Sequence, residues 1–165
     1  MRLSAISLLH SLAQNANEID NIDDRVRLLS EIGDAYWLVD RNYSWTVLIR
    51  SFKEIDKLVP RGDDGRELFA GQKRNLRQIV LLRIAKHDPA LAKQLIEDQV
   101  KDTPTMDEKA SKLYGADNPS SEAFLSIAQS LIATDPKRAA LIASYSLRDG
   151  LSQRFRYFLI RRVIR

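Results

Sequence analysis

The stretch 124–143, FLSIAQSLIATDPKRAALIA, contains the pattern that decides the fold. Its apolar residues recur every three or four positions, which is the period of an amphipathic helix. Asp135 and Pro136 interrupt the run. An aspartate side chain caps the first turn of a helix well, and proline is tolerated at the first helical position. The stretch therefore predicts two helices joined by a short acidic turn.

The same turn follows a leucine-rich segment at two earlier places in the chain. The segment 28–39 ends at Asp40, and the segment 79–87 ends at Asp88, which is followed by Pro89. The steps between the three aspartates are 48 and 47 residues. A spacing of this size is typical of stacked helical hairpins. We therefore predict an all-α fold, a right-handed stack of about three antiparallel hairpins with a half-repeat at each end.

Apolar periodicity and capping residues divide the chain into helices within a single domain, 1–165. Asp23 or Asp24 is the expected N-cap of the second helix, and Gly71 is a possible break in the fourth. Residues 102–119 are the least regular stretch and predict a mobile or inserted loop, with room for a short helix near its middle. The expected helices cover 3–18, 24–39, 42–58, 67–87, 89–100, 119–134, 136–147 and 152–164, and Gly150 is placed to end the helix before the last.

When the three aspartates are aligned with one another, small residues also align on the helices that follow them. Ala92 and Ala139 each follow the aspartate by four positions, and Ala140 follows by five. Small residues allow the two helices of a hairpin to approach closely. Ser44-Trp45 occupies the matching place in the first unit. We therefore expect a bulkier inner face there, as in a repeat that caps the end of a stack.

With these turns, the chain resembles tandem α-hairpin repeat proteins. It is close in period to the HEAT-type class. In its Asp-Pro-x-x-Ala turn it is similar to several uncharacterised bacterial helical-repeat proteins. Arg138 loosely matches the arginine that follows the HEAT turn, and the chain departs from the tetratricopeptide pattern in period and in signature residues. The resemblance implies a scaffold or partner-binding role without a transferable active site.

Composition fits a globular protein with a sizeable core. The chain has 165 residues, of which 44% are hydrophobic and 29% charged, and it has no cysteine. No apolar run approaches the ~18 residues that a membrane-spanning helix needs. Arg2 and the apolar residues after it faintly resemble an export signal, but the helical step of Leu3, Ile6 and Leu9 favours a structural helix. We expect a cytoplasmic protein, with a cleaved export signal as the alternative.

Residues able to carry out catalysis or bind metal are few and scattered. The two histidines, His10 and His87, are 77 residues apart. Asp20, Asp23 and Asp24 form an acidic cluster, but it lacks the glycine and the terminal glutamate of a calcium loop, so helix capping is the better interpretation. We therefore predict that the protein is not an enzyme and has no metal or cofactor site.

Aromatic residues gather around the first acidic turn. Tyr36, Trp37, Tyr43 and Trp45 all lie within ten positions of one another. Core filling explains most such clusters. An aromatic-lined groove for a ligand or peptide is the alternative, because aromatic side chains are common anchors at interfaces. Trp37 and Trp45 are therefore candidate partner-binding residues.

Basic charge accumulates toward the end of the chain. The formal net charge is +4 overall, but residues 148–165 alone carry six basic residues and one acidic residue. A protein partner or further repeats of a longer chain could cover this apolar and basic segment. The alternatives are nucleic acid and an anionic membrane surface. We predict a non-catalytic scaffold for protein–protein interaction, with a nucleic-acid-binding α-repeat as the alternative. The candidate residues here are Arg154, Phe155, Arg156, Phe158, Arg161, Arg162 and Arg165.

Overall fold

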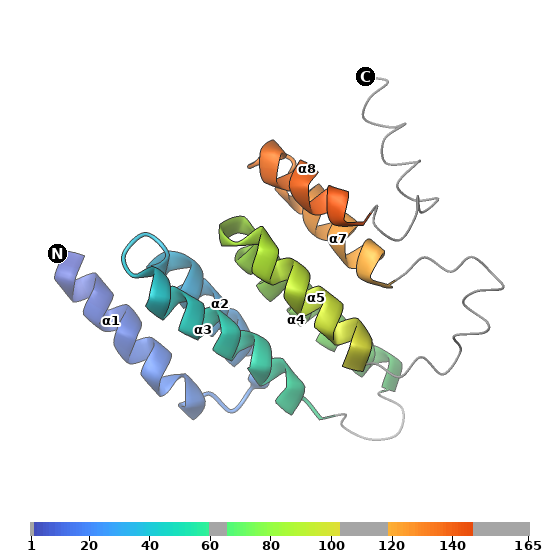
Figure 1. Ribbon diagram of the computed structural model, residues 1–165. Helices are drawn as coiled ribbons and strands as arrows, with labels where there is room; N and C mark the ends of the chain where they lie inside the picture. The colour runs from blue at the N-terminus through green and yellow to red at the C-terminus, as the bar shows by residue number, and fades with distance from the viewer. Residues whose placement is uncertain (1, 60–65, 103–118, 147–165) are drawn as a thin grey trace. The chain divides into compact units, whose positions relative to one another are not determined.

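The described part of the chain is entirely helical. A computed structural model describes residues 2–59, 66–102 and 119–146, and these ranges contain no strand (Figure 1). The all-α prediction is confirmed for this part of the chain. Two compact units divide the chain, a first unit of Met1–His87 and a second unit of Asp88–Arg165. None of the helices in the described ranges is both long enough and apolar enough to span a lipid bilayer.

The first unit is built around an antiparallel hairpin of two helices. α2 covers Ile22–Tyr36 and α3 covers Arg41–Glu54, with a 3-10 turn over Ile55–Lys57 at the end of α3. α4, Arg66–His87, packs against both helices of the hairpin (Figure 1). It runs without a break through Gly71, so the possible break there is not found. The predicted helices over these stretches are confirmed to within a few residues.

The N-terminal helix packs onto the same hairpin. α1, Arg2–Asn15, runs into a 3-10 turn and contacts α2. Two polar side chains anchor its backbone: the Tyr36 hydroxyl donates to the carbonyl of Ile6 at 2.8 Å, and Arg50 Nη1 donates to the carbonyl of Ala13 at 2.8 Å. Burial of apolar side chains provides most of the stabilisation here. The buried cluster consists of Ala13, Ala16, Leu29, Ile32, Tyr36 and Val47, with Ile6, Leu9, Leu28 and Tyr43 packed against it.

Close contacts of Gly33 with side chains of α3 determine the packing between the two helices of the α2–α3 hairpin. A Cβ placed on Gly33 would lie 2.6 Å from Cγ of the buried Leu48, so no larger residue fits without a shift of the leucine. The Ser44 hydroxyl, also buried, donates to the carbonyl of Gly33 at 2.6 Å. The expected bulkier inner face at Ser44-Trp45 is therefore wrong. The small Ser44 occupies the inner position, and Trp45 is half-buried beside it.

The N-cap of α2 differs from the prediction. Asn21, rather than Asp23 or Asp24, is the capping residue, because α2 begins at Ile22 and the Asn21 side chain accepts a hydrogen bond from the Asp23 amide at 3.0 Å. The two aspartates lie in the first turn instead, where negative charge interacts favourably with the helix dipole. Asp23 also binds Nε of Arg27 at 2.6 Å. Asp23 and Asp24 thus stabilise the start of α2 from inside its first turn, and the interpretation of the acidic cluster as helix caps is wrong.

The second unit contains another antiparallel hairpin. α7 covers Pro119–Leu131 and α8 covers Pro136–Tyr145, while α5, Pro89–Asp102, contacts both (Figure 1). All three helices begin with proline, where the missing amide costs nothing. The buried residues of this unit include Ala92, Ile96, Phe124, Ile127, Ala128, Leu131, Ala139 and Ile142.

The predicted aspartate caps are confirmed at all three turns. Asp40 Oδ1 accepts from the Tyr43 amide at 3.0 Å, and Asp135 Oδ1 accepts from the Arg138 amide at 3.0 Å. Asp88 Oδ1 accepts from two amides of α5, at 2.9 and 3.0 Å. The middle predicted hairpin, α4 with α5, spans the boundary between the two units. Its pairing, the right-handed stack and the single repeat domain stay predictions.

Three sequence predictions lie outside the described residues. They are the loop over 102–119 apart from its edges, the left-handed turn at Gly150, and the final helix over 152–164.

Candidate interaction site

The α2–α3 turn places three apolar residues in succession. The amides of Val39 and Asp40 both donate to the carbonyl of Tyr36 at 2.9 Å, which closes the turn at the end of α2. Leu38 is 93% exposed and Val39 57% exposed. Apolar side chains at such exposure stabilise the fold little, because they leave almost no surface buried. They are the most exposed adjacent pair of large apolar residues in the described chain.

Trp37, the first residue of this turn, is fixed from three directions. Its ring meets that of Trp45 edge to face, with centroids 5.4 Å apart and planes at 88°. The His87 imidazole at the end of α4 stacks on the Trp37 indole at 4.3 Å and 20°. The Arg41 guanidinium lies 5.4 Å from the indole centroid, within the range of a cation–π contact. The indole is therefore held in place directly before the exposed Leu38 and Val39 in the chain.

Asp34 links the end of α4 to the hairpin. Its carboxylate binds Nζ of Lys86 at 3.0 Å and Nε2 of His87 at 2.5 Å. Burial alone would raise the pKa of Asp34. The hydrogen bonds and charges of Lys86 and His87 outweigh burial, so the pKa lies below its ordinary value. The carboxylate is ionised at neutral pH and holds α4 beside the turn.

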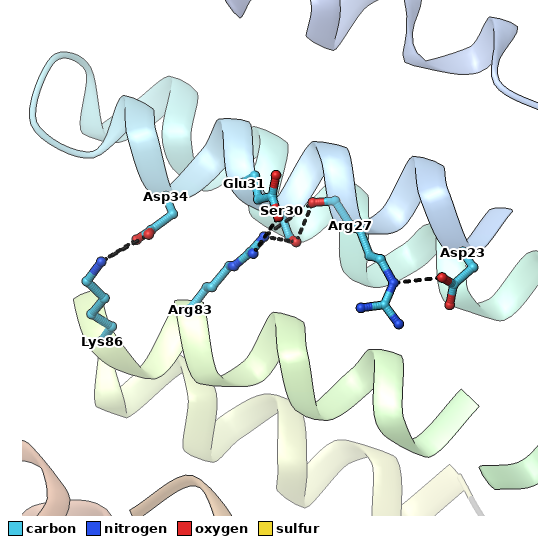
Figure 2. A network of polar contacts seen from close by, with 7 residues as sticks. All are labelled: Asp23, Arg27, Ser30, Glu31, Asp34, Arg83 and Lys86. Atoms are coloured by element: carbon cyan, nitrogen blue, oxygen red, sulfur yellow. Dashed lines mark hydrogen bonds and ion pairs between the residues drawn. The ribbon is translucent and has the colours of Figure 1, made fainter. Parts of the chain in front are cut away.

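A second set of polar contacts joins α4 to α2, about one helical turn before Lys86 and His87. Figure 2 shows Arg83 extending from α4 to Ser30 and Glu31 on α2, and Lys86 extending to Asp34. Arg83 Nη1 donates to the Ser30 hydroxyl and to the Arg27 carbonyl, and Nη2 binds Glu31 at 3.1 Å. Ser30 is buried, and its hydroxyl donates a hydrogen bond to the Arg27 carbonyl at 2.8 Å. The guanidinium therefore provides a hydrogen-bond donor to the buried Ser30 hydroxyl.

A buried carboxylate at the other end of the hairpin also forms ion pairs with both of its oxygens. Glu54 binds Arg25 at 3.0 Å and Lys57 at 2.5 Å. Burial acts to raise the pKa of Glu54, but the hydrogen bonds from Lys57 and Arg25 lower it below its ordinary value. A general acid needs the opposite shift, toward neutral pH. Asp34 and Glu54 are therefore suited to holding helices together.

The aromatic cluster predicted from sequence is in fact two clusters. Tyr36 and Tyr43 face α1, with ring centroids 4.6 Å apart, and His10 lies 4.8 Å from Tyr43. Trp37 contacts Trp45 and stacks on His87 of α4 instead. Successive residues on a helix point about 100° apart, so neighbours in sequence contact different helices. Trp37 is the aromatic residue that directly precedes the exposed Leu38 and Val39.

The structure tests only part of the predicted site. Trp37 and Trp45 are brought together, and the two histidines belong to separate clusters. Sequence reasoning missed Leu38 and Val39; the signal was an apolar Trp-Leu-Val run directly before a capping aspartate. No group of three His, Cys, Asp or Glu side chains in the described ranges could hold a metal ion. The candidates Arg154, Phe155, Arg156, Phe158, Arg161, Arg162 and Arg165 lie outside the described residues.

Comparison with known proteins gives no relative from which a role could be inferred. No protein family, curated protein or solved structure matches the chain.

Proposed function

We propose that this protein is a non-catalytic helical scaffold that binds another protein through the α2–α3 turn. The observation that carries the proposal is the exposure of Leu38 and Val39 directly beside the rigid Trp37. Adjacent apolar side chains displayed on a rigid surface are typical of interaction sites. Trp37 is already held by its ring contacts, so ordering this side chain adds little to the entropy cost of binding.

The α7–α8 turn supports this interpretation as an internal control. Thr134 and Asp135 donate to the Leu131 carbonyl at 3.1 and 2.8 Å, which repeats the bonds of the first turn. The residues corresponding to Leu38 and Val39 are Ala133 and Thr134. The same backbone turn thus forms with small or polar side chains. Folding does not explain why the first turn carries leucine and valine, whereas binding does.

The charges around the turn favour a protein partner over a polyanion. The formal charges of Asp34 and Asp40 are balanced by those of Arg41 and Lys86, so any net positive charge at the turn is limited to that of His87. Nucleic-acid phosphates and anionic lipids need an excess of positive charge. Several described arginines are also committed to groups of the chain itself. These are Arg25, Arg27, Arg50, Arg77 and Arg83.

Site-specific photocrosslinking tests the proposal. A crosslinking amino acid replaces Leu38 in one variant and Ala133, its counterpart in the other turn, in the matched control. We expect position 38 to capture a defined protein in extracts of the native cell, and position 133 not to. The captured protein is then produced pure, and its affinity is measured with the wild type and with Leu38→Ser.

A direct interaction predicts a large loss of affinity in Leu38→Ser. Burying a leucine contributes about 1.5–3 kcal/mol, which corresponds to about a 10- to 150-fold weaker complex. Equal capture at 38 and 133, or unchanged affinity of Leu38→Ser, contradicts the proposal. Capture that disappears on nuclease treatment would instead support the nucleic-acid hypothesis.

A further inference from the structure

α1 has two apolar sides, and only one of them is used inside the first unit. Ala13 and Ala16 belong to the buried cluster, with Ile6 and Leu9 packed against it. Leu8 and Leu12 lie on the other side and are 61% and 41% exposed. Residues four positions apart on a helix are neighbours on its surface. The two leucines therefore form one apolar ridge along the outer side of α1.

This outer side also lacks charge. Residues 3–17 contain no Asp, Glu, Lys or Arg, whereas 29% of the whole chain is charged. A run of fifteen residues in an ordinary soluble protein would contain about four charged residues. Each of the other α-helices in the described ranges carries at least one charged residue beyond its first position. The residues exposed beside the two leucines are small or polar, such as Ser11 and Gln14, so no formal charge of α1 itself lies against the ridge.

We propose that α1 binds α1 of a second copy of this chain across a two-fold axis. A two-fold interface brings each patch against itself, so any charge near the axis meets a like charge. The uncharged ridge of α1 avoids this cost, because apolar side chains are self-complementary. A different protein partner would usually be selected by complementary charges, and α1 presents none.

The side chains around the ridge suit helix-to-helix packing. Ala5 and Ser11 are exposed small residues that flank Leu8 and Leu12. Small residues beside leucines let a second helix approach closely, with its leucines between them. α1 is 14 residues long, or about 21 Å, so the contact is at the low end of interface sizes. We expect a weak dimer, with a Kd of about 10–1000 µM.

Sedimentation equilibrium of the full chain tests this proposal. The wild type should change from monomer to dimer mass as its concentration rises through the expected Kd. Leu8→Glu with Leu12→Glu, and separately Leu8→Lys with Leu12→Lys, should each stay monomeric because like charges face each other. An equimolar mixture of the two double variants should recover the dimer, because opposite charges then meet. Leu141→Glu, on an exposed leucine of α8, is the matched control and should dimerise as the wild type does.

Several outcomes would overturn the proposal. These are a monomeric wild type at every concentration, a dimer that persists in the Glu variant, or a mixture that fails to recover it. Circular dichroism should show wild-type helix content in each variant, because the replaced side chains are exposed.

A second experiment measures binding of the protein to vesicles of phosphatidylcholine and phosphatidylserine. Binding of a monomeric wild type that is lost in the Glu variant would show that the ridge contacts lipid instead. The turn at Leu38 is unaffected by these changes, so this test and that of the proposed function fail independently.

Discussion

The α2–α3 and α7–α8 hairpins have the same turn but opposite solutions to the packing between their helices. Their capping aspartates, Asp40 and Asp135, make the same hydrogen bond to the third amide of the following helix. Ser51 and Ser146 also occupy matching places, and each donates to the carbonyl three residues before it, at 2.8 and 2.6 Å. The two hairpins therefore share these polar contacts, whereas the bond from Ser44 to the Gly33 carbonyl has no counterpart at Ala139.

The apolar seam differs between the two hairpins. In the first, Gly33 faces the large Leu48; the corresponding residues of the second are Ala128 and Ala143. One hairpin thus combines no side chain with a large one, and the other combines two methyl groups. The comparison teaches that the cap and turn determine the backbone path, while the seam can be filled in more than one way.

The largest expected effect comes from exchanging one seam for the other. Gly33→Ala places a methyl group against Leu48, and overpacking of a buried site costs about 1–3 kcal/mol of unfolding free energy. Leu48→Ala alone leaves a cavity and costs about 2–5 kcal/mol. The double variant reproduces the Ala-Ala seam of the second unit. We expect its loss of stability to be smaller than the sum of the two by about 0.5–3 kcal/mol.

Urea denaturation followed by circular dichroism measures this coupling. Ala128→Gly in α7 is the control, with an expected cost of about 1 kcal/mol from helix propensity and no coupling to position 48. Simple additivity of Gly33→Ala and Leu48→Ala would show that the two positions do not share the seam.

The aspartate caps should contribute equally in the two hairpins. Asp40→Ala and Asp135→Ala each remove a cap bond of 3.0 Å, and each should cost about 1 kcal/mol. Asparagine, which also caps well, should restore most of the stability at either position. Thermal unfolding of the four single variants, with alanine or asparagine at position 40 or 135, measures the comparison. A clearly larger loss of stability at one position would mean that the two caps contribute different free energies despite their matching geometry.

Low pH should weaken the contact that Asp34 makes with α4 in the first unit. The corresponding position of the second hairpin should not respond to pH. The pKa of Asp34 is lowered in the folded state. Its contribution is therefore present above the unfolded pKa and is lost as the pH falls through the lower folded pKa. Position 129, which corresponds to Asp34 in α7, is a glutamine and does not titrate.

We expect Asp34→Asn to lower stability at neutral pH by a few tenths to about 1 kcal/mol, since the group is partly exposed. The difference from wild type should shrink as the pH falls through the lowered folded pKa of Asp34. Glu54 is present in both proteins, so its titration cancels in the difference, which reports Asp34 together with its partners Lys86 and His87. Urea denaturation across the acidic range measures it. A difference that is constant with pH would exclude the carboxylate as its cause.

The smallest effect should come from the turn residues themselves. Leu38→Ala removes a side chain that is almost entirely exposed, so the unfolding free energy should change by less than about 0.5 kcal/mol. Ala133→Leu, the reverse exchange in the second turn, should be equally neutral. Thermal unfolding of both variants measures this. A substantial loss in Leu38→Ala would mean that the leucine serves the fold, which would remove the main support for the proposed binding role.

Features that depend on neighbours in sequence were predictable. The three caps and the helix-initiating prolines at 89, 119 and 136 located the helices to within a few residues, because capping acts over three or four positions. The cap of α2 was misplaced by two or three residues because asparagine and aspartate cap about equally well. Three candidates within four positions, Asn21, Asp23 and Asp24, then leave the start of the helix ambiguous.

Contacts between distant segments were not predictable in the same way. Arg83 and Ser30 are 53 residues apart, and one sequence does not show which polar residues meet across two helices. The contact of Gly33 with Leu48 follows only from the crossing of α2 and α3. The division of the aromatic cluster also depends on which helix lies on each side of the hairpin. Leu38 and Val39 looked like ordinary turn residues until their exposure was known.

The pairing of Trp37 with Trp45 has a practical consequence for spectroscopy. They are the only two tryptophans of the chain, and both belong to the first unit. Intrinsic indole emission therefore reports on that unit alone, and circular dichroism reports on the helices of both. Where the two signals change at different denaturant concentrations, the units unfold separately; where they coincide, the units melt together. The protein thus contains its own probe of whether its two halves are energetically coupled.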